Sequence, residues 1–556
     1  MEQEKNKKFF GLIKRIIICA ILLATSIFVI QTAKYYVRND IENQTNLIIN
    51  NNNVTKRLKS KLIVENDNIY ISINDLKNFF DNFIYEDSNQ VITSSEKKVA
   101  SIGFNEKVIN INGANIKTKA TAIKKDEVTY LPINELLNVY DVQMEYLKNT
   151  DIVTLDSLDK EQTKATACKN VSVKLYARNL SRTVDKLKQG AMVVVISEKD
   201  GWTKVRTENG KIGYIKNNKL TNYIKIRDDM QAQKQISGKI NLFWDYYSEY
   251  VSAPDRTGEY IQGVNVVSPT MFYIDSNGKF VEKSKDAAKK YVEWAHSNNY
   301  KVWALVSNDK AGIKTTSSIL QSYEERTRII EEILRVSTEY GLDGINIDFE
   351  NMYQDDKDNF SQFIIELAPR MREIGLVTSV DVTAPDGSPT WSLCFDRIVL
   401  GKVADYLMFM AYDQFGSSSN KAGTTAGYDW VELGINKFLK THEVDSNKLI
   451  LGLPLYTRLW TETANGEVSS KTVNMKDIDS TLSEANSSKV WNDDLKQFYI
   501  EYASGSTTKK MWIEDITSIK AKVSLVNKYN LGGVASWEKD REDEAVWSVI
   551  EEELKK

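Results

Sequence analysis

Alternating polar side chains in one apolar stretch are the residues of this sequence with the clearest chemical potential. The stretch runs from Asp343 to Glu350 and reads Asp-Gly-Ile-Asn-Ile-Asp-Phe-Glu. Alternate side chains of a β-strand share one face, so Asn346, Asp348 and Glu350 are expected to point one way and the apolar residues between them the other. Two carboxylates about 6.6 Å apart along a strand repel each other in a protein interior, which a fold shaped only by stability would avoid.

That repulsion is useful to an enzyme. It can keep Glu350 protonated near neutral pH while Asp348 stays charged, which divides an acid role from an electrostatic role. The chain has only two histidines, His296 and His442, so the usual base of Ser-His-Asp chemistry and most zinc sites are excluded. Its three widely spaced cysteines predict neither a disulfide framework nor a Cys-x-x-Cys metal site. Carboxylates are therefore the expected acid–base groups.

Length and charge set further limits. A chain of 556 residues predicts about two to four domains. Its formal net charge of −3 offers no basic excess, so nucleic acid is not an expected partner.

The amino-terminal segment has the pattern of a membrane anchor. Basic residues precede an apolar run over residues 16–30, and Tyr35, Tyr36 and Arg38 follow it. This order predicts a cytoplasmic tip and a transmembrane signal-anchor over residues 1–38, with the rest of the chain outside the membrane. The run is shorter than the ~20 residues that span a bilayer, so a cleaved signal peptide and a secreted protein remain the alternative. The Asn-rich residues 39–57 are expected to be a linker.

An internal repeat follows within residues 58–158. The segment from Tyr70 to Leu76 recurs as Tyr130 to Leu136, and each copy predicts a short strand that enters a helix capped at Asn or Ser. We expect a small α+β domain with two related halves. It resembles the non-catalytic amino-terminal-type domain of copper amine oxidases, without a His cluster for copper, and the resemblance implies a spacer or adaptor.

Residues 166–226 contain short alternating runs typical of antiparallel strands. The Gly-Trp pair at Trp202 and the later Gly-Tyr-Ile resemble a bacterial SH3 domain, and this resemblance implies contact with wall peptides. Trp202 itself is as easily explained as a core residue.

Strand-like and helical stretches alternate through residues 236–556, which predicts a (β/α)8 TIM barrel. The eight expected strands are 240–246, 264–273, 302–306, 344–350, 377–384, 406–412, 449–456 and 533–537. An insertion over about 457–511 follows the seventh strand and is expected on the catalytic face, where it can wall a groove.

These motifs together resemble family 18 of the glycoside hydrolases, the chitinase family. The family signature Asp-x-x-Asp-x-Asp-x-Glu fits residues 343–350 except at Asn346, and members similar to spore-cortex N-acetylglucosaminidases often carry Asn there. Segments ending in Asp413, Arg458 and Trp537 follow in the family's order. The resemblance covers essentially the whole of residues 236–556.

The resemblance implies a mechanism in which the substrate's own N-acetyl group is the nucleophile. Glu350 would protonate the leaving oxygen, Asp348 would orient the acetamido nitrogen, and Tyr412 would bind the acetamido oxygen. Asn346 and Asp343 would support Asp348 from behind, and neither metal nor cofactor is required.

The resemblance also implies a sugar-binding pocket. Trp537 would form its apolar floor, with Met410, Asp413, Tyr456 and Arg458 around it. The expected function is therefore a membrane-anchored N-acetylglucosaminidase that acts on peptidoglycan or spore cortex. A chitinase, or a non-catalytic glycan-binding protein on the same barrel, are the alternatives.

Overall fold

The computed structural model describes residues 11, 13–26, 41, 43–227, 236–483, 485 and 487–556. The chain forms two compact units. The second unit contains residues 234–556 together with residues 94–99, and the first contains the other residues up to 233.

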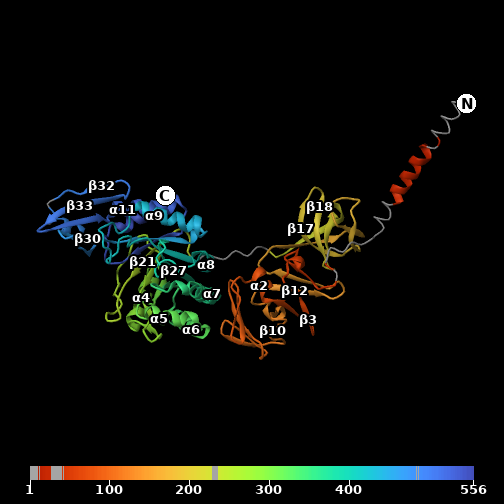
Figure 1. Cartoon of the computed structure of the whole chain (residues 1–556), viewed down its shortest axis with the longest axis horizontal. Coiled ribbons are helices and arrows are strands. Elements are labelled where there is room, and N and C mark those ends of the chain that lie inside the picture. The colour runs from red at the N-terminus through yellow and green to blue at the C-terminus, as the bar shows by residue number, and fades with distance from the viewer. Residues whose placement is uncertain are drawn as a thin grey trace. The chain divides into compact units, whose positions relative to one another are not determined.

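A closed barrel of eight parallel strands is the centre of the second unit (Figure 1). Its ring closes because β22 pairs with both β21 and β25. The strands are β21 (Ile240–Asp245), β22 (Val266–Pro269), β25 (Lys301–Ser307), β26 (Gly344–Asp348), β27 (Val377–Thr383), β28 (Tyr406–Met410), β29 (Leu449–Pro454) and β35 (Gly533–Trp537). All eight predicted strands are present, and the TIM-barrel prediction is confirmed.

Two strand boundaries differ from the prediction. The catalytic strand β26 ends at Asp348, so Glu350 lies just beyond it and not within it. The long second strand is interrupted after β22, and the chain then forms a hairpin of β23 (Phe272–Ile274) and β24 (Phe280–Glu282).

Helices surround the barrel and cover its outer face. They are α4 (Lys285–Ser297), α5 (Gly312–Gln321), α6 (Tyr323–Tyr340), α7 (Lys357–Glu373), α8 (Arg397–Val403), α9 (Tyr428–Asn436), α11 (Ile516–Lys528) and α12 (Val546–Leu554). Local signals set their ends: Ser322 caps α6 by accepting a hydrogen bond from the backbone of Glu325, and Gly341 ends it in a left-handed conformation.

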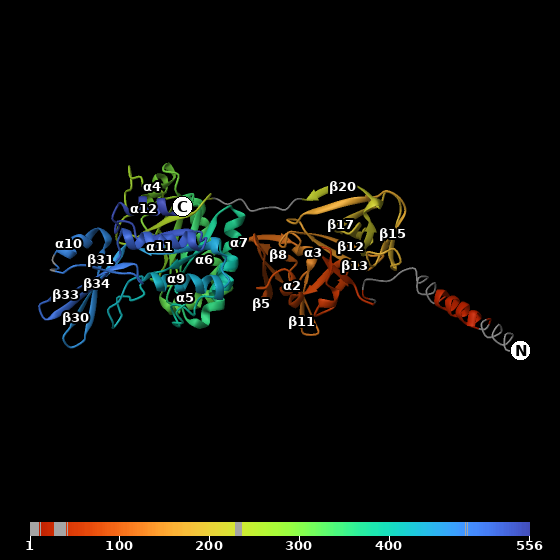
Figure 2. The same ribbon diagram turned by 90° about the horizontal axis from the view of Figure 1, so that it is seen from above.

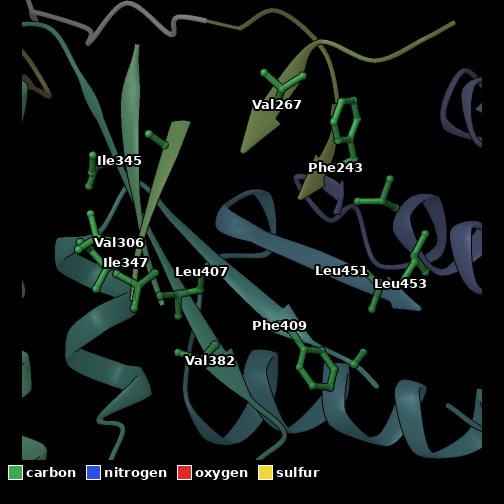
Figure 3. Packing of buried hydrophobic residues seen from close by; sticks show 14 of the residues in the cluster. Phe243, Val267, Val306, Ile345, Ile347, Val382, Leu407, Phe409, Leu451 and Leu453 are labelled. Carbon is green, nitrogen blue, oxygen red and sulfur yellow. The ribbon is translucent and has the colours of Figure 1, made fainter. Parts of the chain in front are cut away.

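Strand alternation produces two apolar layers. Ile345, Ile347 and Phe409 point outward and pack with the surrounding helices, as Figure 3 shows for residues of this layer. Trp244 and Trp303 belong to a separate cluster inside the barrel. The outward direction of the apolar residues of β26 confirms the predicted alternation, which leaves Asn346 and Asp348 for the interior.

Gly344 lets this interior close. A Cβ atom added there would lie 2.7 Å from the Trp303 ring and 2.8 Å from the Val377 carbonyl oxygen. A larger residue at the start of β26 would therefore push the strand away from both neighbours.

The predicted insertion forms a five-stranded antiparallel sheet beside the barrel (Figure 2). Its elements are β30 (Tyr456–Thr463), β31 (Val468–Asn474), α10 (Ile478–Ser483), β32 (Val490–Asn492), β33 (Gln497–Ser504) and β34 (Thr507–Ile513). Directly after β34, Glu514 forms a fully buried ion pair with Lys522 of α11 at 2.8 Å.

The first unit contains the predicted repeat. β4 (Asn68–Ser72) leads into α2 (Ile73–Phe79), and β11 (Val128–Pro132) leads into α3 (Ile133–Leu136). β4 and β11 pair antiparallel, so the two halves meet through equivalent strands. Ser72 caps α2 as expected, but Pro132 occupies the N-cap of α3 without a side-chain hydrogen bond.

The predicted linker 39–57 is partly wrong. β1 (Asn46–Ile49) within it pairs in parallel with β13 (Ile152–Ser157), so this segment belongs to the folded domain. The other elements are β2 (Asn52–Asn53), η1 (Thr55–Arg57), β3 (Ile63–Glu65), β5 (Tyr85–Asp87), β6 (Gln90–Ser94), β7 (Val99–Gly103), β8 (Val108–Ile111), β9 (Ala114–Lys117), β10 (Ile123–Lys125) and β12 (Val142–Leu147).

Residues 162–227 form a seven-stranded sheet. Its strands are β14 (Gln162–Ala167), β15 (Val171–Lys174), β16 (Thr183–Leu187), β17 (Met192–Lys199), β18 (Trp202–Thr207), β19 (Ile212–Lys216) and β20 (Leu220–Arg227). Trp202 is half-buried and lies outside the core of this sheet, with the Lys216 ammonium 5.7 Å from its ring. The Arg206 guanidinium binds both oxygens of Asp156 and so joins this domain to the repeat domain. The SH3-like and copper-amine-oxidase-like assignments stay predictions.

Residues 13–26 of the expected anchor are helical. Among the residues that the structure describes, no helix has the length and hydrophobicity needed to cross a bilayer. The remainder of the expected anchor, including residues 27–38, lies outside the described residues.

Candidate active site

Glu350 is held by the loop that follows β25. The Asn308 side chain accepts a hydrogen bond from the Glu350 backbone N–H at 2.8 Å and donates one to its carbonyl oxygen at 2.9 Å. Asn308 is buried and also donates to Thr316 of α5. The backbone of Glu350 is thus fixed although the residue lies beyond the end of its strand.

Most of the predicted site residues line one cavity of about 590 Å³. Those it brings together are Asp348, Glu350, Met410, Tyr412, Asp413, Tyr456 and Trp537. Its volume lies within the ordinary range of small-molecule sites. Tyr456, which begins β30 just before the predicted insertion 457–511, lines this cavity, and no described residue of 457–511 does.

The two acidic residues influence each other strongly. Burial raises the pKa of Asp348 well above its ordinary value, and the neighbouring Glu350 charge raises it further. Burial also raises the pKa of Glu350, although its hydrogen bond to Asp348 acts in the opposite direction. Two carboxyl groups coupled in this way titrate as a pair. The expected division, with Glu350 protonated and Asp348 charged, stays a prediction.

One carboxylate oxygen of this pair has no hydrogen-bond partner among the described residues. Asp348 Oδ1 is buried and accepts no hydrogen bond from any residue that the structure describes. A buried acceptor without a donor costs about 1–3 kcal/mol, and a ligand that brings an N–H or O–H group would recover that cost.

Tyr412 provides a hydroxyl group at the same cavity. Burial, followed by the charge of Asp381, raises its pKa well above the ordinary value. The phenol therefore remains a hydrogen-bond donor at neutral pH.

Trp537 closes the barrel interior at the end of β35. Its ring centroid lies 5.9 Å from that of Trp244 and 6.2 Å from that of Tyr246. One part of the indole thus packs on the barrel core while Trp537 also lines the cavity. This position is suited to the expected apolar floor.

Arg458 contacts Asp413, which lines the cavity. Arg458 itself does not line the cavity, but its Nη2 lies 3.3 Å from Asp413 Oδ1. Asp413 has a positive φ of 54°, a conformation that few residues other than glycine adopt.

Asn346 and Asp343 occupy different places from those expected. Asn346 is fully buried behind the cavity, and its side chain forms hydrogen bonds with Trp244, Ser268, Ser379 and Asp381. None of these bonds reaches Asp348, so any influence of Asn346 on the acid pair is indirect.

The expected support of Asp348 by Asp343 is wrong. Asp343 precedes β26 and accepts hydrogen bonds from Lys301 Nζ at 2.7 Å and the Val302 backbone at 3.0 Å, with His296 Nε2 at 2.9 Å. It lies five positions before Asp348 along the chain, at about 3.3 Å for each position of the strand. It fixes the opposite end of the barrel.

Several lining residues were missed by the sequence analysis, among them Asp381, Trp391 and Trp430. The sequence could have predicted Asp381 as a lining residue. Ser379, Asp381 and Thr383 alternate with valines in β27, just as the polar residues alternate with apolar ones in β26. Trp391 lies in a loop and had no comparable signal.

Solved structures with a similar fold include chitinases. The chitinase from Chromobacterium violaceum aligns with a TM-score of 0.51 and 23% identity, over 57% of this chain and 100% of that one. The carboxyl-terminal domain of a putative chitinase from Desulfitobacterium hafniense gives 0.50 and 23%, again over 57% and 100%. These likenesses concern the fold.

Sequence relatives include bacterial glycosylases. The uncharacterized glycosylase YvbX of Bacillus subtilis is 24% identical over 296 residues, which cover 52% of this chain and 84% of YvbX. The cortical fragment-lytic enzyme of the same organism is 24% identical over 291 residues, or 50% of this chain and 66% of that enzyme. The sequence model of Glycosyl hydrolases family 18 matches residues 239–542, more than half of the chain. The protein is therefore a glycosidase and belongs to family 18 of the glycosyl hydrolases.

Proposed function

We propose that this protein hydrolyses the β-1,4 bond that follows N-acetylglucosamine in bacterial wall glycan, either peptidoglycan or spore cortex. The observation that carries the proposal is the unpaired, buried Oδ1 of Asp348 in the cavity that also contains Glu350, Tyr412 and Trp537. An acetamido N–H is the donor that a 2-acetamido sugar would bring to this oxygen.

These positions support the following reaction. Glu350 gives its proton to the glycosidic oxygen as the bond from that oxygen to the anomeric carbon breaks. The acetamido oxygen, oriented by Tyr412, forms a bond to the anomeric carbon, and Asp348 holds the N–H of the resulting oxazolinium ion. Glu350 then removes a proton from water, which attacks the anomeric carbon and restores the acetamido group with retained configuration.

The charge of the cavity favours N-acetylglucosamine over N-acetylmuramic acid at the cleaved position. Its lining includes the carboxyl groups of Asp348, Glu350, Asp381, Asp386 and Asp413. Neither lysine nor arginine is among the described lining residues. The lactyl carboxylate of a muramic acid would meet like charge here, whereas N-acetylglucosamine is neutral.

Two features favour wall glycan over chitin. One relative is a cortical fragment-lytic enzyme, and the expected anchor and SH3-like domain suit a protein that works beside a wall. Other relatives include the human di-N-acetylchitobiase, so a chitin-like substrate is the alternative outcome of the test.

The test compares the wild type with Glu350→Gln and Asp348→Asn on purified peptidoglycan, spore cortex and N-acetylglucosamine oligomers. Mass spectrometry should find products with reducing-end N-acetylglucosamine from wall glycan, and both variants should lose at least ~100-fold in rate. Cleavage of the oligomers alone would indicate a chitinase. Binding without turnover by the wild type would indicate a glycan-binding protein.

We also propose that the amino-terminal segment attaches the enzyme to the outer face of a cell membrane. The support is the apolar run over residues 16–30 with basic residues before it. Alkaline carbonate should leave the full chain in the membrane fraction, whereas a soluble product shortened at the amino terminus would indicate cleavage and secretion.

A further inference from the structure

We infer that Asp381 is a positioning residue for the Asp348–Glu350 pair and supplies, from the neighbouring strand, the negative charge that the family signature carries at the position of Asn346. This inference rests on the proposed function, because it concerns how the same acid pair keeps its proton. Asp381 belongs to β27, and the sequence motif of β26 does not include it.

The orientation of the Asn346 amide is fixed by its neighbours. The Trp244 indole Nε1, which can only donate, lies 2.7 Å from Asn346 Oδ1, and the Ser268 hydroxyl donates to the same oxygen at 3.3 Å. The amide nitrogen must then face the other way. It donates to Ser379 Oγ at 3.2 Å and to Asp381 Oδ1 at 2.7 Å.

This arrangement explains why residue 346 is an amide. An aspartate at position 346 would direct a second carboxylate oxygen at Asp381 over the distance now spanned by the 2.7 Å hydrogen bond. Two unprotonated carboxylates at such a distance repel strongly in a buried site. In this chain the amide of Asn346 thus stands on β26 and the acid of Asp381 on the neighbouring β27.

Asp381 is the member of the acidic cluster that Asn346 contacts directly. It is 2% exposed, and within the described ranges no lysine or arginine forms an ion pair with it. Glu350 and Asp348 face it from the β26 side and Tyr412 from the β28 side. Burial raises the pKa of Asp381 well above its ordinary value and the Glu350 charge raises it further, whereas the hydrogen bond from Asn346 favours the ionised form.

The consequence is electrostatic. Burial raises the pKa of Asp348 most, and the charges of Glu350 and then Asp381 raise it further. In its ionised form, Asp381 thus helps the pair to retain the proton that the first chemical step consumes. It acts through the pair and through Asn346 and needs no contact with the reacting bond.

The experiment is a charge-exchange series of full-length proteins: Asp381→Asn, Asn346→Asp and the double exchange. Activity is measured against pH on N-acetylglucosamine oligomers or wall glycan, whichever the wild type cleaves. Asp381→Asn should shift the alkaline limb of the kcat/KM profile to a pH about one unit lower. At pH values above that limb the rate should fall about tenfold, while KM changes little.

The double exchange should recover most of the lost rate and most of the shift in the alkaline limb. The reason is that it places a carboxylate on β26 and an amide opposite it on β27. Asn346→Asp alone should move the limb upward and lower the melting temperature, since two carboxylates then face each other. Asp445→Asn changes the charge by the same amount on an exposed loop at the other end of the barrel and should change neither quantity.

The possible results separate the two hypotheses. A wild type that cleaves no 2-acetamido glycan would contradict the proposed function. An active wild type whose Asp381→Asn variant keeps the normal kcat and pH limb would contradict this inference alone. An Asp381→Asn variant with a lower melting temperature but an unshifted alkaline limb would show that Asp381 serves stability, and would overturn the inference. A double exchange that recovers neither the rate nor the limb would overturn the inference in the same way.

Discussion

The Tyr456 hydroxyl donates a 2.7 Å hydrogen bond to Oδ1 of Asp413, the same oxygen that Arg458 reaches at 3.3 Å. Tyr456 begins the insertion sheet and Asp413 follows β28, so the bond ties the insertion to the barrel at the cavity rim. The Asp413 side chain remains half exposed and lines the cavity, so it can also meet a sugar hydroxyl.

Tyr456→Phe should weaken substrate binding with little change in kcat. A hydrogen bond to a charged group contributes about 1.5–3 kcal/mol, and exposure of Asp413 reduces this toward 1 kcal/mol, so we expect KM to rise about fivefold. Steady-state kinetics on a soluble oligomer measure it. Tyr529→Phe, which removes a hydroxyl contact with Glu432 at the outer helices, is the matched control. Equal effects of the two substitutions would contradict a role at the site.

Trp537→Ala should lower kcat/KM by about 10- to 100-fold, because the apolar surface under the sugar contributes roughly 1.5–3 kcal/mol when it is covered. Trp537→Phe should lose less than half of the binding energy that Trp537→Ala loses. Since the indole also packs on Trp244, melting curves must accompany the kinetics. If alanine reduces stability but leaves kcat/KM unchanged, Trp537 is a core residue and not a sugar platform.

Glu350→Gln should make the protein more stable at neutral and alkaline pH. The folded pKa of Glu350 is raised above its unfolded value of about 4.3, so the folded state holds the proton more tightly. This contribution to stability is complete below pH ~4 and is lost as pH rises through the folded pKa. The melting temperature of the variant, compared with that of the wild type, should therefore increase from pH 4 to pH 8. A constant difference over this range would contradict the raised pKa.

Lys522→Met should destabilise the barrel by about 3–5 kcal/mol, because it leaves the Glu514 carboxylate buried without its cation. Burial already raises the pKa of Glu514, and Lys522 opposes that shift. Urea denaturation of Lys522→Met, Glu514→Leu and the double variant measures the coupling. The double variant should be more stable than either single one, and simple additivity of the two losses would argue against the ion pair.

Much of the site was determined by the sequence itself. Period-two alternation over residues 344–350 predicts which side chains face the barrel interior, because the direction of a side chain depends only on the local strand geometry. The same local patterns located all eight strands and the insertion. Asp348, Glu350, Tyr412 and Trp537 do line one cavity, since parallel strands bring their carboxyl ends together at one rim.

Tertiary structure decided what lies between strands. The register that sets Asn346 opposite Ser379 brings Asp381 to the Asn346 amide, and no spacing along one strand contains that register. The raised pKa of Asp348 likewise depends on burial by other elements and on the neighbouring Glu350 charge. Asp343, although part of the sequence motif, faces the opposite end of the barrel, and β1 joins β13 more than 100 residues away in sequence. Local patterns fix the direction of a side chain, whereas its partners are fixed by which distant segments pack against it.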